Sequence, residues 1–150
     1  MQTTRLARSG FTLIELLLVI GIIAILASIV IVAINPKKQL GDARDTQRRA
    51  DVNTILNAIS QYTVDNKGNL PSCITTSAKQ ICQTGAADCS AFCNLSVLTD
   101  SGTYLVKMPV DPQVASGTGG THYEVVKNSN GRITVSAMSP ENTTSISVTR

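Results

Sequence analysis

Residues 11–34 read FTLIELLLVIGIIAILASIVIVAI, an apolar run of 24 residues with one charged side chain, Glu15. As an α-helix rising about 1.5 Å per residue, this run would span roughly 36 Å, enough to cross a hydrocarbon core of about 30 Å. It is longer than the apolar region of a cleaved secretory signal, which covers roughly 7–15 residues. The run therefore predicts a transmembrane helix that is retained by the mature protein.

Glu15 is the unusual residue of the run, because a carboxylate in lipid is costly. One interpretation is that its side chain reaches the nearby headgroups. The other is that it pairs with a cation on another chain, since its own helix offers none nearby. A cut between Gly10 and Phe11 would create a positively charged amino terminus about 6 Å along the helix axis from Glu15. In a second copy shifted along the axis, that terminus would lie level with the carboxylate and fix the register of packed helices.

The segment RSGFTLIELLLVIGIIAIL, residues 8–26, resembles the class III signal of type IV pilins and type II secretion pseudopilins. Gly10, Phe11 and Glu15 match this signal, and a short basic leader precedes them. The resemblance implies that a prepilin peptidase cleaves after Gly10 and methylates the amino group of Phe11. It also implies that an inner-membrane pilus or secretion assembly machinery moves the subunits from the membrane into a homopolymeric fibre. Glu15 would there meet the Phe11 amine of a neighbour.

The chain of 150 residues divides into three predicted parts. Residues 1–10 are a leader peptide, and residues 11–35 are a transmembrane and assembly helix. Residues 36–150 form an extracytoplasmic globular domain that includes the second half of the helix. Pro36 is expected to kink or split this helix just beyond the membrane, because proline lacks the N–H that the helix needs.

Helical spacing returns from residue 38 to about residue 66. Five residues fall on one stripe, which predicts a face packed on a sheet: Val52, Ile55, Leu56, Ile59 and Tyr62. The first half of the helix is crowded with charges, namely Arg44, Asp45, Arg48, Arg49 and Asp51. Asp45 and Arg49 have the favourable i,i+4 order for an ion pair. We interpret these charges as a solvated helix face, with contacts between subunits as the alternative.

The C-terminal half is rich in strand-like runs. They cover residues 104–108, 122–127, 132–137 and 145–149, and NSNG at 128–131 is suited to a hairpin connection. Tyr123 and Val125 would share one face of the sheet, as would Ile133 and Val135. Residues 72–103 have weak periodicity and are expected to form a long loop. The predicted fold class is α+β and pilin-like: a long N-terminal helix packed on a small antiparallel sheet, with a disulfide-stapled loop.

All four cysteines, Cys73, Cys82, Cys89 and Cys93, lie within this loop. An even count in a small exported domain predicts two disulfides. Three pairings are possible, and Cys73–Cys82 with Cys89–Cys93 is the one that we favour. A zinc site is the alternative, but the separations of nine, seven and four residues lack the C-x2-C pairs of zinc ribbons. Disulfides imply an oxidising compartment.

The orientation of the helix is contested within the sequence. Arg5 and Arg8 precede it, whereas five basic residues follow it: Lys37, Lys38, Arg44, Arg48 and Arg49. The positive-inside rule therefore favours a cytoplasmic C-terminal domain, although long domains often translocate regardless of charge. The cysteines favour the opposite orientation. We place the precursor in the inner (cytoplasmic) membrane with its C-terminal domain outside, and the mature subunit in an extracellular pilus or a periplasmic pseudopilus.

Signs of catalysis, cofactors and nucleic-acid binding are weak. The lone histidine, His122, has no catalytic arrangement of partners around it, and we predict no enzyme, no catalytic residue and no metal site. Calcium bound near Asp100 and Asp111 is a minor alternative, in a segment where some pseudopilins hold that ion. Without Arg5 and Arg8 the chain has 11 basic and 10 acidic side chains, and aromatics make up 3% of it. This balance gives no reason to expect a nucleic-acid partner.

The predicted function is therefore structural: a subunit of a type IV pilus-like filament that polymerises through residues 11–35. The alternative is a pseudopilin of a type II secretion system, which would form a short periplasmic fibre. The cysteine-rich loop favours the surface filament, because an exposed fibre benefits from covalent cross-links. A minor pilin that binds DNA or a surface, and an ordinary single-pass membrane protein, are two further hypotheses.

Overall fold

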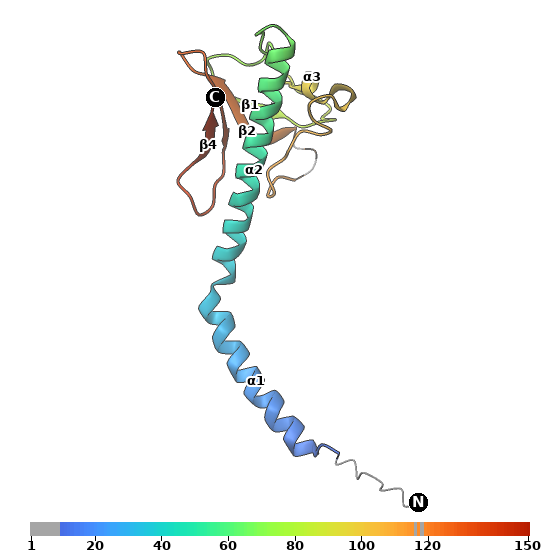
Figure 1. Ribbon diagram of the computed structural model, residues 1–150, viewed down its shortest axis with the longest axis vertical. Coiled ribbons are helices and arrows are strands. Elements are labelled where there is room, and N and C mark those ends of the chain that lie inside the picture. The colour runs from blue at the N-terminus through green and yellow to red at the C-terminus, as the bar shows by residue number, and fades with distance from the viewer. Residues whose placement is uncertain (1–9, 116, 118) are drawn as a thin grey trace, which may run out of the picture. The chain divides into compact units, whose positions relative to one another are not determined.

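A computed structural model of the protein describes residues 10–115, 117 and 119–150, and its two compact units divide between Gln39 and Leu40. Residues 1–9 of the predicted leader therefore lie outside the described residues. The first unit holds α1 (Leu13–Ile34), and α2 (Pro36–Asp65) follows it (Figure 1). Asn35 separates the two helices with a left-handed backbone, φ 49° and ψ 76°. Pro36 occupies the first position of α2, where its missing N–H is tolerated, so the predicted interruption is confirmed.

The end of α2 follows from the turn-forming residues after it. Lys67 and Gly68 both have positive φ, 58° and 89°. The N–H of Gly68 donates to the carbonyl of Thr63 at 2.8 Å, which satisfies one of the last carbonyls of the helix. The turn-forming segment NKGNLP, residues 66–71, thus follows a helix that ends at Asp65, close to the predicted end at about residue 66.

Four antiparallel strands form one sheet in the order β1-β2-β3-β4 (Figure 1). They are β1 (Lys79–Cys82), β2 (Gly120–Lys127), β3 (Ile133–Ala137) and β4 (Ile146–Thr149). Val125 of β2 lies opposite Val135 of β3. The predicted connection at 128–131 is confirmed, because the N–H of Gly131 donates to the carbonyl of Asn128 at 2.9 Å.

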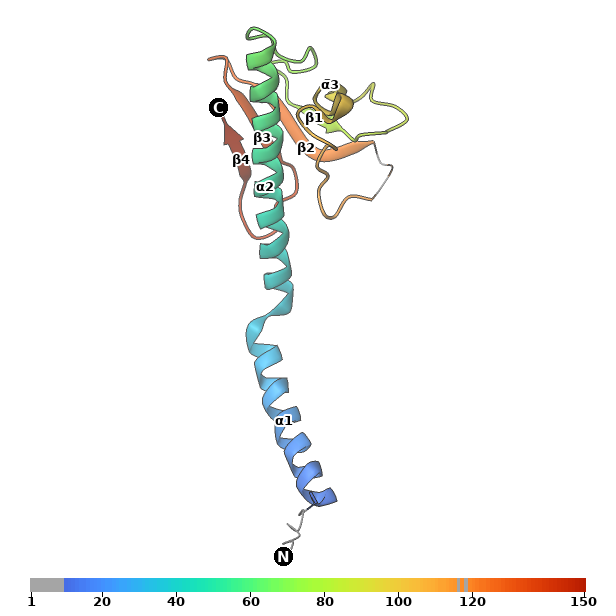
Figure 2. The same ribbon diagram turned by 45° about the vertical axis from the view of Figure 1, so that its right-hand side comes forward.

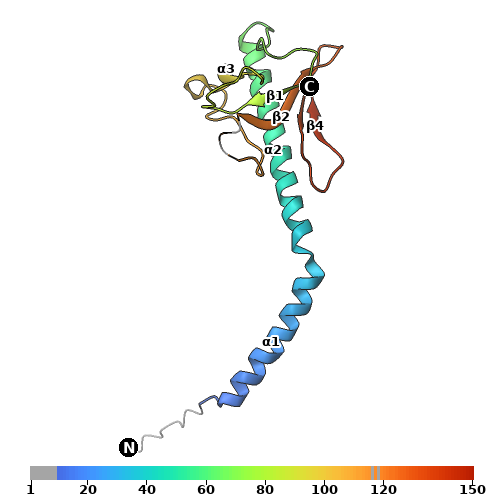
Figure 3. The ribbon, with the colours of Figure 1, turned by 180° about the vertical axis from the view of Figure 1, so that it is seen from behind.

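The core of the second unit lies between α2 and one face of the sheet (Figures 2 and 3). The predicted stripe of α2 is buried there, apart from Tyr62, which is partly buried. Tyr123, Val125, Ile133 and Val135 face it from the sheet, and all four are buried as the alternation predicts. The α+β class with a long N-terminal helix and a small antiparallel sheet is therefore confirmed.

The strand predicted at residues 104–108 is wrong. The N–H of Leu105 donates to the carbonyl of Leu98, and the N–H of Met108 donates to Oγ1 of Thr84, both at 2.9 Å. These backbone N–H groups therefore bond to a carbonyl of a short helix and to a side chain, rather than to the backbone of a neighbouring strand. Tyr104 packs edge-on against Tyr62, with ring centroids 5.8 Å apart.

The predicted long loop at residues 72–103 contains regular structure that the sequence did not indicate. It includes β1 at one edge of the sheet, α3 (Ser96–Thr99) and the 3-10 turn η1 (Asp100–Gly102). The strand β1 has only four residues, and Ile81 is its fully buried member. So short a strand leaves too little alternation to detect.

Candidate assembly site

The helix α1 exposes its whole apolar surface. None of its residues is buried, and its mean hydropathy is 3.3 over a membrane-length window. Side chains from Leu13 to Ile34 remain half or more exposed almost throughout, which is far more apolar surface than a soluble monomer leaves in water. This surface requires lipid or other helices around it.

A capping box begins α1 and involves Glu15 directly. The backbone N–H and the hydroxyl of Thr12 both donate to Oε2 of Glu15, at 2.9 and 2.7 Å. In return, the N–H of Glu15 donates to Oγ1 of Thr12 at 3.2 Å. This arrangement satisfies two of the free donors at the helix start and fixes the carboxylate on the first turn. The N–H of Thr12 belongs to the Phe11–Thr12 peptide bond, so a cut after Gly10 would leave the box intact.

Gly10 and Phe11 precede the capping box. Both are exposed, with Phe11 at 87% of its full accessibility, and no heavy atom lies within 4 Å of the place where a Cβ of Gly10 would be. Phe11 lies just before the N-cap residue of α1, and Glu15 lies in its first turn. The three residues predicted for processing and assembly therefore lie together at the start of α1.

The prokaryotic N-terminal methylation motif matches residues 5–31. This motif is the class III signal characteristic of type IV pilins and pseudopilins, and it supports a protein of that class here. Proteins of this class are structural rather than enzymatic, and the motif with its apolar helix fits a membrane-anchored precursor. The motif also implies processing by a prepilin peptidase and assembly into a pilus-type polymer. No curated protein and no solved structure is found to match the chain.

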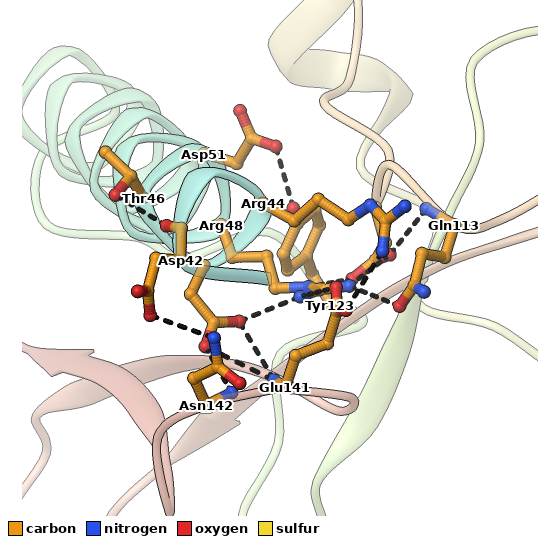
Figure 4. Close-up of polar contacts among 11 residues, drawn as sticks. Asp42, Arg44, Thr46, Arg48, Asp51, Gln113, Tyr123, Glu141 and Asn142 are labelled. Carbon is orange, nitrogen blue, oxygen red and sulfur yellow. Dashed lines mark hydrogen bonds and ion pairs between the residues drawn. The ribbon is translucent and has the colours of Figure 1, made fainter. Parts of the chain in front are cut away.

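Arg48 occupies the centre of a buried ionic cluster in the second unit (Figure 4). Its Nε and Nη2 donate to the two oxygens of Asp111 at 2.6 and 3.1 Å. Nη1 donates to Asp45 at 2.8 Å and to Glu141 at 3.0 Å, and Nη2 also donates to Gln113 at 2.8 Å. All five guanidinium N–H groups thus have an acceptor. The cluster ties the first half of α2 to the loop before β2 and to the β3–β4 loop.

Asp45 and Asp111, the two buried carboxylates of this cluster, are held in their charged form. Burial raises the pKa of Asp45, but the backbone N–H groups of Glu141 and Asn142 together with Arg48 outweigh it and lower that pKa to about 2. For Asp111, burial also raises the pKa, and the hydrogen bonds from Arg48 and from the N–H of Gln113 more than offset it, so the pKa is lowered. Asp111 in turn raises the pKa of Arg48. Asp45, Asp111 and Arg48 are therefore ionised over the whole ordinary pH range.

A second buried contact adjoins the cluster. The hydroxyl of Tyr123 donates to Oδ2 of Asp51 at 2.7 Å, and Nε2 of Gln47 donates to Oδ1 at 2.8 Å. Burial raises the pKa of Tyr123, and the Asp51 carboxylate raises it further. Tyr123 is completely buried, so this bond satisfies the one polar atom of its side chain.

The interpretation of these charges as a solvated face is wrong for Asp45, Arg48 and Asp51, all of which are buried. The predicted i,i+4 pair is also wrong, because Asp45 pairs with Arg48 at i,i+3 rather than with Arg49. Arg48 lies four residues before Val52 and therefore on the apolar stripe of α2. That position was the signal in the sequence that indicated burial.

The four cysteines form two disulfides, but not in the pairing that we favoured. Cys73 bonds to Cys93, and Cys82 bonds to Cys89. Cys82 and Cys89 both lie between Cys73 and Cys93 in the sequence, so one disulfide is nested within the other. Cys93 is placed beside β1, where its N–H donates to the carbonyl of Gln80 at 2.7 Å. Its partner is Cys73, 20 residues away, rather than Cys89, which is its nearest cysteine in sequence.

The remaining candidates carry little chemistry. Asp111 turns both oxygens toward Arg48, and within the described ranges no group of three or more His, Cys, Asp or Glu side chains could hold a metal ion. Calcium binding near Asp100 stays a prediction. His122 lies exposed on β2.

Proposed function

We propose that this protein is the structural subunit of a type IV pilus-like filament, which polymerises through α1 after cleavage between Gly10 and Phe11. The observation that carries the proposal is a fully exposed apolar helix whose start holds an ordered carboxylate beside the processing junction. Lipid covers this helix in the precursor, and the same helices of other subunits cover it in the filament.

The geometry of Glu15 supports a role in matching subunits. Both bonds from Thr12 go to Oε2, so Oε1 can accept a bond from a further donor. The methylated amine of Phe11 on an adjacent subunit is such a donor, and only processing creates it. An ion pair formed away from water is strongly favoured over an unpaired carboxylate. Glu15 and Phe11 would therefore select one axial shift between neighbouring helices.

The two disulfides support an extracytoplasmic position for the second unit, because disulfides persist in oxidising compartments. They also favour an extended surface filament over the alternative, a short periplasmic pseudopilus of a type II secretion system. Electron microscopy of cells that produce the protein distinguishes these two: long surface filaments support the pilus, and their absence together with impaired secretion supports the pseudopilus.

Two measurements test the proposal. Mass spectrometry of the mature protein should find methylated Phe11 as its first residue; an intact Met1, or a cut elsewhere, would overturn the proposal. The second measurement is the filament yield of a variant: Glu15→Ala should insert into the membrane normally but yield few or no filaments. Ser28→Ala is the matched control, because Ser28 is a polar residue of the same helix that bonds only to its own backbone, at Ile25. Normal filaments from Glu15→Ala would contradict the role of the ion pair.

A further inference from the structure

The two disulfides of the second unit are nested. Cys73–Cys93 spans 20 residues in sequence, and Cys82–Cys89, which spans seven, lies inside that interval. The second and third cysteines along the chain, Cys82 and Cys89, are partners. The first and last of the four cysteines are partners. This connectivity has consequences for how the bonds form.

If the domain crosses the membrane after α1, as the proposed function requires, the cysteines reach the oxidising side in chain order. Cys73 and Cys82 arrive first, and neither is the native partner of the other. Closure of a flexible loop of nine residues is about threefold more probable than closure of one of 20 residues. The native Cys82–Cys89 loop of seven residues is slightly shorter than nine, but Cys73–Cys82 with Cys89–Cys93 closes loops of nine and four residues, against 20 and seven for the native pairing. Arrival order and the combined loop lengths therefore both favour Cys73–Cys82 with Cys89–Cys93.

The geometry that selects the native partners forms later. Cys82 ends β1, and β1 is held by β2, with Cys82 opposite Gly120. The N–H of Cys82 donates to the carbonyl of Cys93 at 3.0 Å, and the N–H of Gln83 donates to the carbonyl of Gly119 at 2.8 Å. The strand β1, beside which Cys93 lies, is thus complete only when residues 119–125 have arrived. All four cysteines are exposed to oxidant before that point.

We propose that this chain is a substrate of a thiol–disulfide isomerase, which converts a sequential isomer, Cys73–Cys82 with Cys89–Cys93, into the nested native one. A disulfide-donating oxidase first takes four electrons and four protons from the four thiols. The sequential isomer then holds no free thiol, so it cannot rearrange by itself. An external thiolate is required.

Three exchanges, each making one S–S bond and breaking one, complete the conversion. The thiolate of the isomerase attacks Cys73, forms a mixed disulfide and releases the thiolate of Cys82. Cys82 attacks Cys89, forms the native Cys82–Cys89 bond and releases Cys93. Cys93 then attacks Cys73 in the mixed disulfide, forms the native Cys73–Cys93 bond and releases the isomerase thiolate. No electron is gained or lost, and the final bonds are protected because Cys93 is fully buried and Cys82 is 4% exposed.

Refolding of the full chain tests this proposal. The reduced protein, unfolded in urea with detergent, is diluted into a thiol-free oxidant, and free thiols are trapped with N-ethylmaleimide. Cleavage after Lys79, before Asp88 and after Phe92 places the four cysteines on four different peptides, so mass spectrometry identifies each bond. We expect the sequential isomer to exceed the nested one severalfold. Addition of a reduced dithiol isomerase should convert most of it to the nested form.

Two results would overturn the proposal: the nested isomer as the main product without any thiol, or a sequential isomer that the isomerase leaves unchanged. The matched control is the double variant Cys82→Ser/Cys89→Ser, in which Cys73 can bond only to Cys93. The isomerase should not change the oxidation product of this variant. A strain without thiol–disulfide isomerases should export the sequential form, and full nested pairing there would also overturn the proposal. The refolding arm involves no membrane crossing and no filament, so its failure is distinguishable from failure of the proposed function.

Discussion

Arg48 and Asp111, 63 residues apart in sequence, form a bidentate ion pair in which both side chains are fully buried. Arg48 comes from α2 and Asp111 from the loop that leads to β2, and the pair fastens one to the other. Desolvation of two charges is costly, and their mutual attraction offsets it only when every remaining donor and acceptor is satisfied. Here the other N–H groups of Arg48 reach Asp45, Glu141 and Gln113.

Removal of Arg48 is expected to be far more damaging than removal of its neighbour. Arg48→Ala leaves buried carboxylates without a cation, which should lower the free energy of unfolding by roughly 3–5 kcal/mol. Arg48→Lys keeps the charge but loses the bidentate geometry, and we expect a loss of about 1–3 kcal/mol. Urea unfolding of the full chain in detergent micelles, followed by the fluorescence of its three tyrosines, measures both.

Arg49→Ala is the control for these variants. Arg49 carries the same charge one position along α2 but is exposed, so its replacement should change stability by less than about 0.5 kcal/mol. If Arg48→Ala and Arg49→Ala lowered the free energy of unfolding equally, the buried cluster would not be what holds α2 to the loop before β2 and to the β3–β4 loop.

The same cluster predicts loss of stability in acid. The pKa of Asp45 is about 2 in the folded protein, against an ordinary value of 3.8. A lowered folded pKa means that the unfolded chain binds the proton first as the pH falls. The stabilisation is therefore complete above about pH 5 and declines as the pH falls toward 2, by on the order of 1–2 kcal/mol for this one group. Asp111, whose pKa is also lowered, acts in the same direction.

Urea midpoints measured from pH 6 down to pH 2 check this expectation. The variant Asp45→Asn removes the titrating group, so its midpoint should fall less steeply over that interval than the midpoint of the unsubstituted protein. Parallel curves for the two proteins would show that Asp45 is not the source of the acid sensitivity.

At the other end of the chain, the capping box makes Thr12 a positioning residue for Glu15. Thr12→Val keeps the shape of the side chain but removes its hydroxyl, which should destabilise the first turn of α1 by about 1 kcal/mol. The Glu15 carboxylate would lose one of its two bonds, so we expect severalfold fewer filaments with unchanged membrane insertion. Hydrogen exchange at residues 13–15 in micelles and the yield of sheared filaments measure the two effects.

Thr12→Ser provides the comparison, since serine retains the hydroxyl and caps helices as well as threonine does. It should assemble normally. Equal filament yields from Thr12→Val and Thr12→Ser would mean that the hydroxyl has no part in placing Glu15.

The parts of this protein that the sequence predicted are those with a long periodic pattern. The apolar run, the stripe of α2 and the alternation in β2 and β3 each repeat over enough residues to specify a structure. The strand expected at residues 104–108 was wrong because Tyr104 packs against Tyr62 of α2, and Leu105 and Met108 join the core without pairing with a strand. Val106 is exposed. Local pattern does not distinguish these two ways of burying a side chain.

The polar interior escaped prediction for a different reason. Charged side chains on a helix are usually solvated. Only the final position of the loops decides whether side chains of opposite charge contact them. Glu141 and Asp111 reach Arg48 from segments 93 and 63 residues away in sequence. The disulfide pairing likewise escaped prediction, because the cysteine spacing does not encode the position of Cys93 beside Gln80 of β1.

Gly41 provides a test of how closely the β3–β4 loop approaches α2. A Cβ added at this buried helical position would lie 2.7 Å from Nδ2 of Asn142, which itself donates to Asp42 at 2.9 Å. Alanine is favoured over glycine in a helix by about 1 kcal/mol. Displacement of the Asn142 side chain would forfeit a hydrogen bond of about the same net value. Gly41→Ala alone should therefore leave stability nearly unchanged.

In an Asn142→Ala background the obstructing amide is absent, so the same Gly41→Ala substitution should stabilise the domain by about 1 kcal/mol. The two single variants and the double variant form a thermodynamic cycle, and urea unfolding should give a coupling energy near that value. The backbone N–H of Asn142 still donates to Asp45 at 2.8 Å in both backgrounds, so the loop keeps its attachment to the cluster. An effect of Gly41→Ala that is the same with and without the Asn142 side chain would show that the loop does not press against α2 at this point.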